Sequence, residues 1–329
     1  MGIRDLNHLL RNNCPKSIQC VNISELSGKK IAVDISIYLY KYETDNALME
    51  NIYTMLSIFR YYNVIPIFIF DGKPPPEKKA LIQKRKEDRT SAQEEYNNLK
   101  KQLETNDDDY QDIVTAMDIL KRQIVQIKKD KIDAVKELIR AYGATYYDAP
   151  GEADELCALL VLKKKAWACL SEDMDLFVYG CPRVLRYFSL MAHTAILYYT
   201  KGILEELIMT QKNLKEICIL SGTDYNINSN GNNHEHINLK TTIAHFRKYQ
   251  ETNLTIGFYE WLSENTDYIK DITLLDKINN IFNLENNKEQ LQLFNKIKIS
   301  NSAIKQDKIE TIMEKEDFIF LRKEYPYNE

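Results

Sequence analysis

Two apolar runs separated by a helical pattern lie within the first 70 residues of the chain. Residues 29–36 (KKIAVDIS) predict a short buried strand with a polar step after Asp34. Residues 64–70 (VIPIFIF) predict a second strand, and Asp71 follows its end. The residues between them favour helix, and a β-α-β order indicates a parallel sheet. A run of three prolines at 74–76 then interrupts the pattern.

The stretch from 77 to 142 is highly charged and favours helix, with an acidic break at 106–109. Its second half carries apolar residues at alternating spacings of four and three, which places them on one helix face. They are Ile113, Met117, Leu120, Ile124 and Ile127. Two long helices joined by an acidic turn are therefore predicted. A plain coiled-coil hairpin shows the same pattern, so the pattern leaves the role of this segment open.

Strand and helix patterns alternate again after residue 143. Strands are predicted over 144–147, 166–170, 184–188 and 195–199, and a helix over 152–165. From 201 onward the pattern is helical, apart from a polar loop at 226–236. We therefore expect an α/β fold with a central, mostly parallel sheet flanked by helices, a helical insertion over about 77–142, and a helical C-terminal region. The expected division is a core over 1–215 and a C-terminal region over 216–329.

Acidic residues stand where predicted strands end or where the next helix begins. They are Asp34, Asp71, Glu152, Asp154, Asp173 and Asp175. In an open α/β sheet, ligands bind beyond the carboxyl ends of the strands, so these side chains are expected to converge. Carboxylates brought together repel one another unless a cation binds between them. Oxygen ligands without His or Cys suit Mg²⁺ or Mn²⁺, and two such ions can catalyse phosphodiester hydrolysis.

The same residues also have ordinary structural explanations. Glu152 and Asp154 fall at the start of a predicted helix, where carboxylates are common as caps and are favoured by the helix dipole. Asp173 and Asp175 match the composition of a tight turn. A metal site and a set of caps and turns both remain open at this point.

Composition narrows the classes of protein. The net charge of −4, from 44 basic and 48 acidic residues, argues against a protein that coats nucleic acid non-specifically. Residues 78–89 are nevertheless strongly basic, and a phosphate-binding patch can be local. Its members are Lys78, Lys79, Lys84, Arg85, Lys86 and Arg89. The six scattered cysteines include no C-x-x-C pair, which favours reduced thiols over zinc sites or disulfides.

No apolar run of 18 residues and no signal-peptide pattern is present. We therefore expect an intracellular protein that is not secreted and does not bind a membrane.

Six segments carry a family resemblance. In chain order they read MGIRDLNHLL, IAVDISIYLY, FIFDGKPPPEKK, YDAPGEADELCA, SEDMDLFVYG and ILSGTDYN. They resemble the flap endonuclease family of structure-specific 5′ nucleases, which includes 5′-exonuclease and excision-repair branches. The resemblance covers roughly residues 1–225. It implies a PIN-like nuclease core in which about 77–142 form a helical arch that a single-stranded 5′ flap passes through.

The resemblance also implies two Mg²⁺ ions, with Mn²⁺ able to substitute, held by seven carboxylates. These are Asp34, Asp71, Glu152, Asp154, Asp173, Asp175 and Asp224. Asp173 and Asp175 are expected to be essential for catalysis. Asp154 is Glu in most flap endonucleases and Asp in the exonuclease branch, so the shorter side chain changes the geometry of that ligand.

Further roles follow from the same resemblance. Lys78 and Arg85, seven residues apart and so on one helix face, are expected to hold the scissile phosphate and stabilise its transition-state charge. Tyr40 takes the place of an aromatic residue that stacks on a base, although a half-buried helix tyrosine explains it as well. The remaining expected nucleic-acid contacts are Gly2, Lys79, Lys84, Arg89 and Lys240.

One segment departs from the family pattern. The glycine hairpin that holds a potassium ion in relatives is not recognisable around 236–240, so the C-terminal region is expected to bind duplex through a degenerate helix-hairpin-helix. We expect side chains, with Lys240 and possible partners His234 and His236 when protonated, to meet the phosphate instead. The chain ends without a recognisable sliding-clamp motif.

The expected function is a Mg²⁺-dependent phosphodiesterase, a 5′ flap endonuclease or 5′–3′ exonuclease. Its substrate would be branched or gapped DNA with a free 5′ end, in replication, repair or recombination. A monomer acting in the nucleus, or at a viral or cytoplasmic replication site, is expected. Two alternatives stay open: an RNA-cleaving nuclease of the same fold, and a catalytically inactive nucleic-acid-binding homologue.

Overall fold

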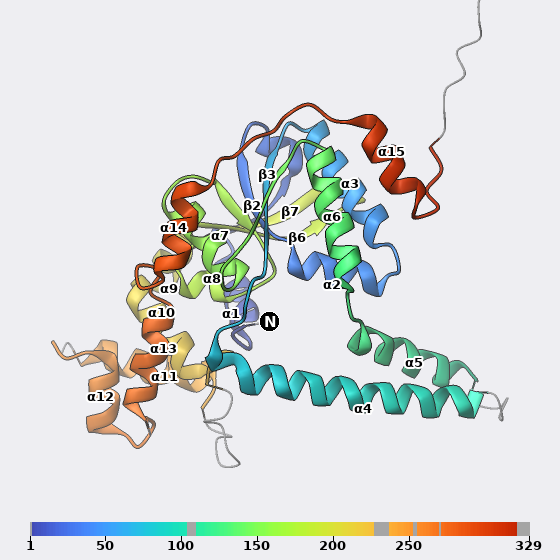
Figure 1. The fold of residues 1–329 in the computed structure, drawn as a ribbon. Helices are drawn as coiled ribbons and strands as arrows, with labels where there is room; N and C mark the ends of the chain where they lie inside the picture. The colour runs from blue at the N-terminus through green and yellow to red at the C-terminus, as the bar shows by residue number, and fades with distance from the viewer. Residues whose placement is uncertain (1, 104–109, 227–236, 253–254, 270, 321–329) are drawn as a thin grey trace, which may run out of the picture.

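A seven-stranded sheet forms the centre of the computed structural model (Figure 1), which describes residues 2–103, 110–226, 237–252, 255–269 and 271–320. The strand order is β1-β7-β6-β5-β2-β3-β4. The strands are β1 (Ile18–Asn22), β2 (Lys30–Asp34), β3 (Ile65–Phe70), β4 (Thr145–Asp148), β5 (Ala168–Leu170), β6 (Arg183–Ser189) and β7 (Thr194–Tyr199).

Four of the six pairings are parallel and join β4, β3, β2, β5 and β6. The β6–β7 and β7–β1 pairings are antiparallel. The expected α/β fold with a mostly parallel sheet is therefore confirmed. Strand β1 was not predicted, because only Val21 of its five residues is buried and an edge strand of this kind has little apolar pattern.

Helices cover both faces of the sheet. One face carries α1 (Leu6–Asn13), α7 (Ala153–Leu162), α8 (Asp175–Val178), α9 (Thr200–Leu207) and α10 (Gln211–Ser221). The other carries α2 (Ser36–Thr44), α3 (Leu48–Tyr61) and α6 (Lys129–Ala141). Strand β3 shows the consequence: Ile67 and Ile69 enter the first core, and Phe68 and Phe70 the second. Burial on both faces explains its unbroken apolar run.

The helical insertion differs from the prediction in its extent. After the short helix η2 (Pro76–Lys78), α4 (Lys79–Leu103) and α5 (Tyr110–Ile124) lie side by side and project from the core (Figure 1). The final part of the predicted 77–142 segment is instead α6, which packs on the core through Val135, Leu138 and Ile139, all fully buried. We call η2, α4 and α5 the arch. The predicted acidic turn at 106–109 lies outside the described residues.

The C-terminal helices are of two kinds. Helices α11 (Leu239–Glu251), α12 (Phe258–Asn265) and α13 (Ile272–Ile281) gather around α10. Helix α14 (Lys288–Lys296) packs against α7, and α15 (Gln306–Glu314) against α6, so the chain returns over the core (Figure 1). The expected boundary at 215/216 therefore does not separate two packing units. Within the described ranges, no helix is both long and apolar enough to cross a bilayer.

Candidate active site

The strand order brings the predicted carboxylates to one edge of the sheet. Asp34 is the last residue of β2, Asp71 follows β3, and the segment after β5 carries Asp173 and Asp175. Helix α7 begins beside them, with Glu152 as its N-cap and Asp154 in its first turn. Strands β5, β2 and β3 are parallel neighbours, so their carboxyl ends meet at this edge.

Contacts within the cluster show how close these groups lie. The Ser171 hydroxyl donates to Asp34 Oδ2 over 2.8 Å, and the Asp175 amide donates to Asp173 Oδ1 over 3.0 Å. Asp71 Oδ1 accepts a 2.8 Å bond from the Ala153 amide at the start of α7. Burial, followed by the nearby charges of Asp71 and Asp173, raises the pKa of Asp34 to about 7. The edge is a crowded anionic site.

Gly2 closes one side of this cluster. Its φ is +72°, in the left-handed region that favours glycine. A Cβ at this position would stand 2.5 Å from Asp175 Oδ1 and 2.6 Å from Asp173 Oδ1. The chain near its N-terminus can therefore approach the two carboxylates this closely only as glycine.

Two cations of the arch reach the cluster, Lys78 from η2 and Arg85 from α4. Lys78 Nζ lies 2.7 Å from Glu152 Oε1 and 3.6 Å from Asp224 Oδ2, and Arg85 Nη2 lies 3.3 Å from the same Asp224 oxygen. Burial alone would lower the pKa of Lys78, but the charges of Asp154 and Glu152 outweigh it and hold that pKa above its ordinary value. Lys78 therefore stays an ammonium at neutral pH and offsets part of the negative charge.

The donor set fits a hard divalent cation. Every predicted ligand is a carboxylate, and Asp175 Oδ1 is buried with no hydrogen-bond partner among the described residues. Burial and the neighbouring carboxylates also raise the pKa values of Asp154 and Asp175 well above the ordinary range. In the described part of the chain, no three His, Cys, Asp or Glu side chains already surround a single point. The case for a divalent cation therefore rests on the clustered negative charge and on the fact that all the predicted ligands are carboxylate oxygens.

Three contributors to this edge were not predicted: Ser171, Tyr225 and Gln290. Tyr225 donates a 2.5 Å hydrogen bond to Glu152 Oε2, and Lys78 Nζ lies 4.8 Å from the centre of its ring. Gln290 of α14 donates to the Glu152 main-chain oxygen over 3.1 Å and to Glu155 Oε2 over 3.3 Å. Ser171 and Tyr225 lie within the quoted segments SEDMDLFVYG and ILSGTDYN and could have been found there. Nothing in the local sequence marks Gln290.

The remaining predicted nucleic-acid residues lie farther out. A cavity of about 730 Å³ between the arch and the core is lined by Tyr40, Arg85 and Arg89 together with Asp71, Lys78 and Glu152. Tyr40 is 54% exposed, so its ring is available to a ligand in this cavity. Lys79 and Lys84 are exposed on α4 and do not line the cavity, and Lys240 is exposed in the first turn of α11. His234 and His236 lie outside the described residues.

The raised pKa of Asp34 leads to a stability prediction for the metal-free protein. A carboxyl group whose pKa is raised to about 7 by folding adds stability at low pH, and that stability is lost as pH rises from about 4 to 7. We therefore expect Asp34→Asn to raise the melting temperature in EDTA most at pH 8, with a gain that shrinks toward pH 4. Thermal unfolding across this range measures it. Asp133→Asn, an exposed change on α6, is the control; parallel curves for the wild type and Asp34→Asn would contradict the prediction.

Comparison with family models identifies both halves of this site. The XPG N-terminal domain matches residues 1–92, and the XPG I-region matches residues 143–224. Together they cover more than half of the chain and contain all seven predicted carboxylates. The unmatched residues between them belong mostly to α4, α5 and α6.

Curated relatives agree with these models. Flap endonuclease 1 of Meyerozyma guilliermondii is 28% identical over 293 residues, which are 82% of this chain and 73% of the relative. Flap endonuclease 1-A of Sorghum bicolor is 31% identical over 244 residues, or 68% of this chain and 62% of the relative. Flap endonuclease 1 of Lodderomyces elongisporus is 28% identical over 68% of this chain and 61% of the relative. The chain thus spans about three fifths of the length of two of these three relatives.

Solved structures share the fold at lower identity. The catalytic core of Rad2 in complex with DNA substrate aligns over 95% of both chains, with a TM-score of 0.62 and 18% identity. Human GEN1 in complex with Holliday junction DNA aligns over 96% of this chain and 74% of that one, with a TM-score of 0.61 and 17% identity. Flap endonuclease-1 from Methanococcus jannaschii gives a TM-score of 0.54 at 20% identity over 91% and 97%. On these matches, and with its carboxylates gathered at one sheet edge, the chain belongs to the XPG and flap endonuclease family of nucleases.

Proposed function

We propose that the chain is a structure-specific 5′ nuclease that hydrolyses phosphodiester bonds of branched or gapped DNA near a free 5′ end. The observation that supports the proposal is that Lys78 and Arg85 of the arch contact Glu152 and Asp224. These contacts lie at the sheet edge where burial and neighbouring carboxylates raise the pKa values of Asp34, Asp154 and Asp175. A crowded anionic cluster is costly for a fold to maintain. A role in binding divalent ions gives it a use, and a purely structural role does not.

The metal would be held by the carboxylates on both sides of Lys78. Asp34, Asp71, Glu152 and Asp154 would hold one Mg²⁺ ion, and Asp173, Asp175 and Asp224 a second, with Mn²⁺ able to substitute. Mg²⁺ bound there would activate water and stabilise the charge on the leaving oxygen. Asp175 Oδ1 gives this proposal its most direct support, because the atom is buried and has no hydrogen-bond partner among the described residues.

The basic side chains would bind the substrate. Lys78 and Arg85 would contact the scissile phosphate instead of Glu152 and Asp224, whose carboxylates would then hold the metal ions. Both cations would thus lie next to the charge that develops during cleavage. Tyr225 would keep Glu152 in position through its hydrogen bond. Tyr40 would stack on a base at the edge of the cavity. The Gly2 backbone would contact the nucleic acid beside Asp173 and Asp175, where a larger residue would not fit.

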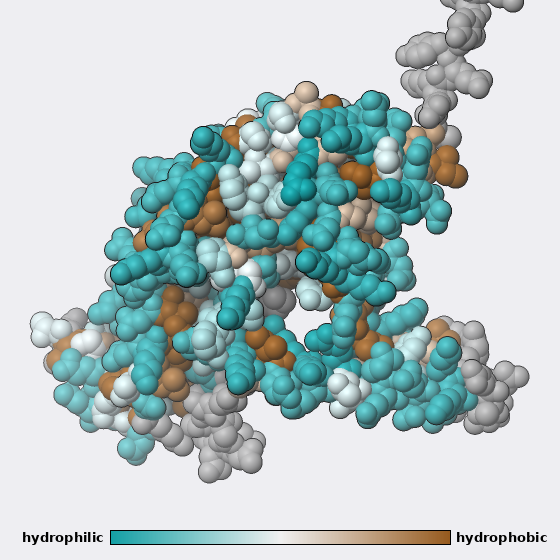
Figure 2. All heavy atoms as spheres, viewed as in Figure 1, coloured by the Kyte–Doolittle hydropathy of each residue, from teal (hydrophilic) through white to brown (hydrophobic). Residues whose placement is uncertain are grey.

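The arch gives the strand with the free 5′ end a path to the carboxylates. An opening between α4 and the core persists with all side chains drawn (Figure 2). Arg89 lines the cavity below it, and Lys79 and Lys84 present exposed ammonium groups on α4. Cations along this path would contact phosphates without reading the sequence. Lys240 would bind the duplex at the start of α11. The proposed enzyme acts as a monomer inside the cell. Because its relatives are flap endonucleases, we propose that it acts in the nucleus, during replication, repair or recombination.

The test is cleavage of a labelled 5′-flap DNA by the purified protein, with Mg²⁺ and with EDTA. We expect cutting near the base of the flap in Mg²⁺ and none in EDTA. An otherwise identical RNA flap tests the sugar preference in the same experiment. A protein that binds the flap yet cuts neither substrate in Mg²⁺ or Mn²⁺ would be an inactive homologue, and the proposal would be wrong.

A further inference from the structure

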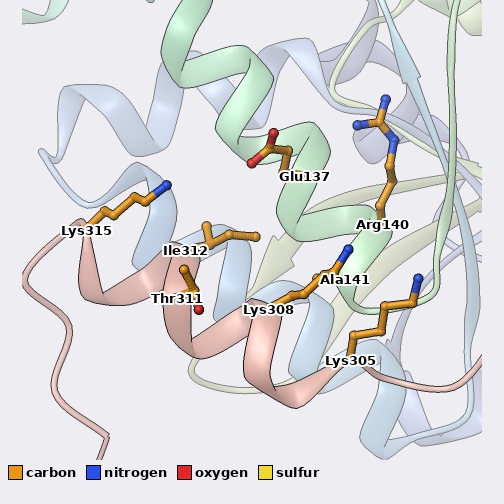
Figure 3. Close-up of a pocket in the computed structure, with 8 residues that line it drawn as sticks. All are labelled: Glu137, Arg140, Ala141, Lys305, Lys308, Thr311, Ile312 and Lys315. Carbon is orange, nitrogen blue, oxygen red and sulfur yellow. The ribbon is translucent and has the colours of Figure 1, made fainter.

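A groove separate from the catalytic edge lies between α6 and α15 (Figure 3). Its volume is about 390 Å³. Ile309 and Met313 fix α15 in place, since both are 1% exposed and belong to the same core as Leu138 and Ile139 of α6. The groove therefore lies between two helices that are packed rigidly against each other.

The groove is lined mainly by cations. Three come from α15 or its ends and one from α6: Lys305, Lys308, Lys315 and Arg140. The only carboxylate among the lining residues is Glu137. Lys305, Lys308 and Lys315 follow spacings of three and seven and so share one helix face. Ten residues of helix correspond to about 15 Å along the axis, so the three ammonium groups form a row along the groove (Figure 3).

Within the described residues, the cations that line the groove have no carboxylate partners. Among the described residues, none of these four cations forms an ion pair within 4 Å. Lys136, also on α6, does form one, with Asp148. The Arg140 guanidinium lies 4.7 Å from the centre of the Tyr146 ring, a contact that orients it and leaves its N–H donors available. Cations kept close together and unpaired favour an anionic ligand.

We propose that this groove binds the phosphate backbone of a nucleic-acid segment that lies outside the cavity under the arch. One strand of a duplex carries a negative charge about every 3.4 Å along the axis, so a 15 Å row of cations can face about four phosphates. Ammonium and guanidinium groups aimed at phosphates carry no sequence information. The groove thus supplies a second, sequence-independent contact that requires neither a metal ion nor cleavage.

The lining residues favour nucleic acid over an acidic protein segment. Peptide-binding grooves usually anchor their ligands with apolar side chains in pockets. Here Ile312 is the only partly exposed apolar side chain in the lining, and Ala141 is buried. The regularly spaced phosphates of a nucleic-acid backbone therefore match the row of lysines better than an acidic peptide, which would find few apolar contacts in the groove.

The test compares two variants that each lose two positive charges. Lys308→Gln/Lys315→Gln changes the groove, and Lys277→Gln/Lys296→Gln changes exposed lysines on α13 and α14, on the opposite side in Figure 1. Binding to a fluorescent flap DNA with long duplex arms is followed by anisotropy in EDTA over a series of salt concentrations. We expect the groove variant alone to bind roughly tenfold more weakly, with the slope of log K against log salt reduced by about 2. Lys308→Arg/Lys315→Arg should bind like the wild type.

Each outcome decides the question. Equal affinity and equal salt slope for the groove and control variants would overturn the proposal. So would loss of poly-glutamate binding by the groove variant with DNA binding intact, because the groove would then be a protein-binding surface. Thermal unfolding checks that both variants fold. Single-turnover cleavage at saturating protein should be unchanged in the groove variant. The binding result stands even if no cleavage is found, so it is independent of the proposed nuclease activity.

Discussion

Replacement of Asp173 or Asp175 by Ala should abolish cleavage in Mg²⁺ and leave the protein folded and able to bind flap DNA. Each change removes a proposed metal ligand from the crowded edge. It also relieves repulsion, because burial and nearby carboxylates raise the pKa of Asp175 well above its ordinary range. The metal-free variants should therefore melt no lower than the wild type. Single-turnover cleavage, anisotropy and thermal unfolding measure the three effects.

The control is Asp133→Ala, which removes an exposed carboxylate from α6. It should leave the cleavage rate unchanged. An Asp173 or Asp175 variant that kept more than about a tenth of the wild-type rate, a loss of less than roughly 1.4 kcal/mol of transition-state stabilisation, would exclude that residue from the two-metal site.

Lys78→Ala and Arg85→Ala should lower the single-turnover rate far more than the affinity for flap DNA. Both side chains contact carboxylates of the catalytic edge, so the phosphate they would meet is the one that reacts. A contact made mainly to developing charge acts in the transition state, whereas an ordinary phosphate contact acts before and during the reaction. Rate constants at saturating enzyme, compared with dissociation constants in EDTA, separate the two.

Neighbouring residues provide matched controls. Lys79 and Lys84 stand beside Lys78 and Arg85 in the sequence, carry the same charge, and are exposed outside the cavity. Lys79→Ala and Lys84→Ala should weaken binding modestly and change the saturated rate little. If Lys79→Ala lowered the rate as much as Lys78→Ala, or Lys84→Ala as much as Arg85→Ala, then Lys78 and Arg85 would be ordinary phosphate contacts.

The sequence predicted the core of the sheet well, because strands buried on both faces leave long apolar runs. Strands β2 and β3 were placed within one or two residues of their observed bounds. Strand β1 escaped prediction because it is an edge strand with one buried residue. The extent of the arch was overestimated, since α6 is as helical and charged as α4 and α5. Its packing against β4, α3 and α15 distinguishes it from them.

The candidate site likewise has a part that the sequence predicted and a part that it did not. Acidic residues at strand ends are visible in the sequence, since the strands that carry them are visible. Family resemblance added Asp224, Lys78 and Arg85, which the strand pattern alone did not reveal. The support from Gln290 could not be predicted, because it depends on how a helix 138 positions later packs against α7. Contacts between distant segments leave no periodic pattern in either segment.

The return of the chain over the core has a consequence for biosynthesis. All seven carboxylates have been translated once Asp224 is added, but Gln290 and α15 follow much later. A nascent chain at that stage lacks the Gln290 hydrogen bond to the Glu152 backbone and the helix that covers α6. Domains usually fold as units during synthesis, and contacts between distant segments form slowly. The catalytic edge of this protein therefore gains its last hydrogen-bonding support from α14, which is translated well after the last of the seven carboxylates.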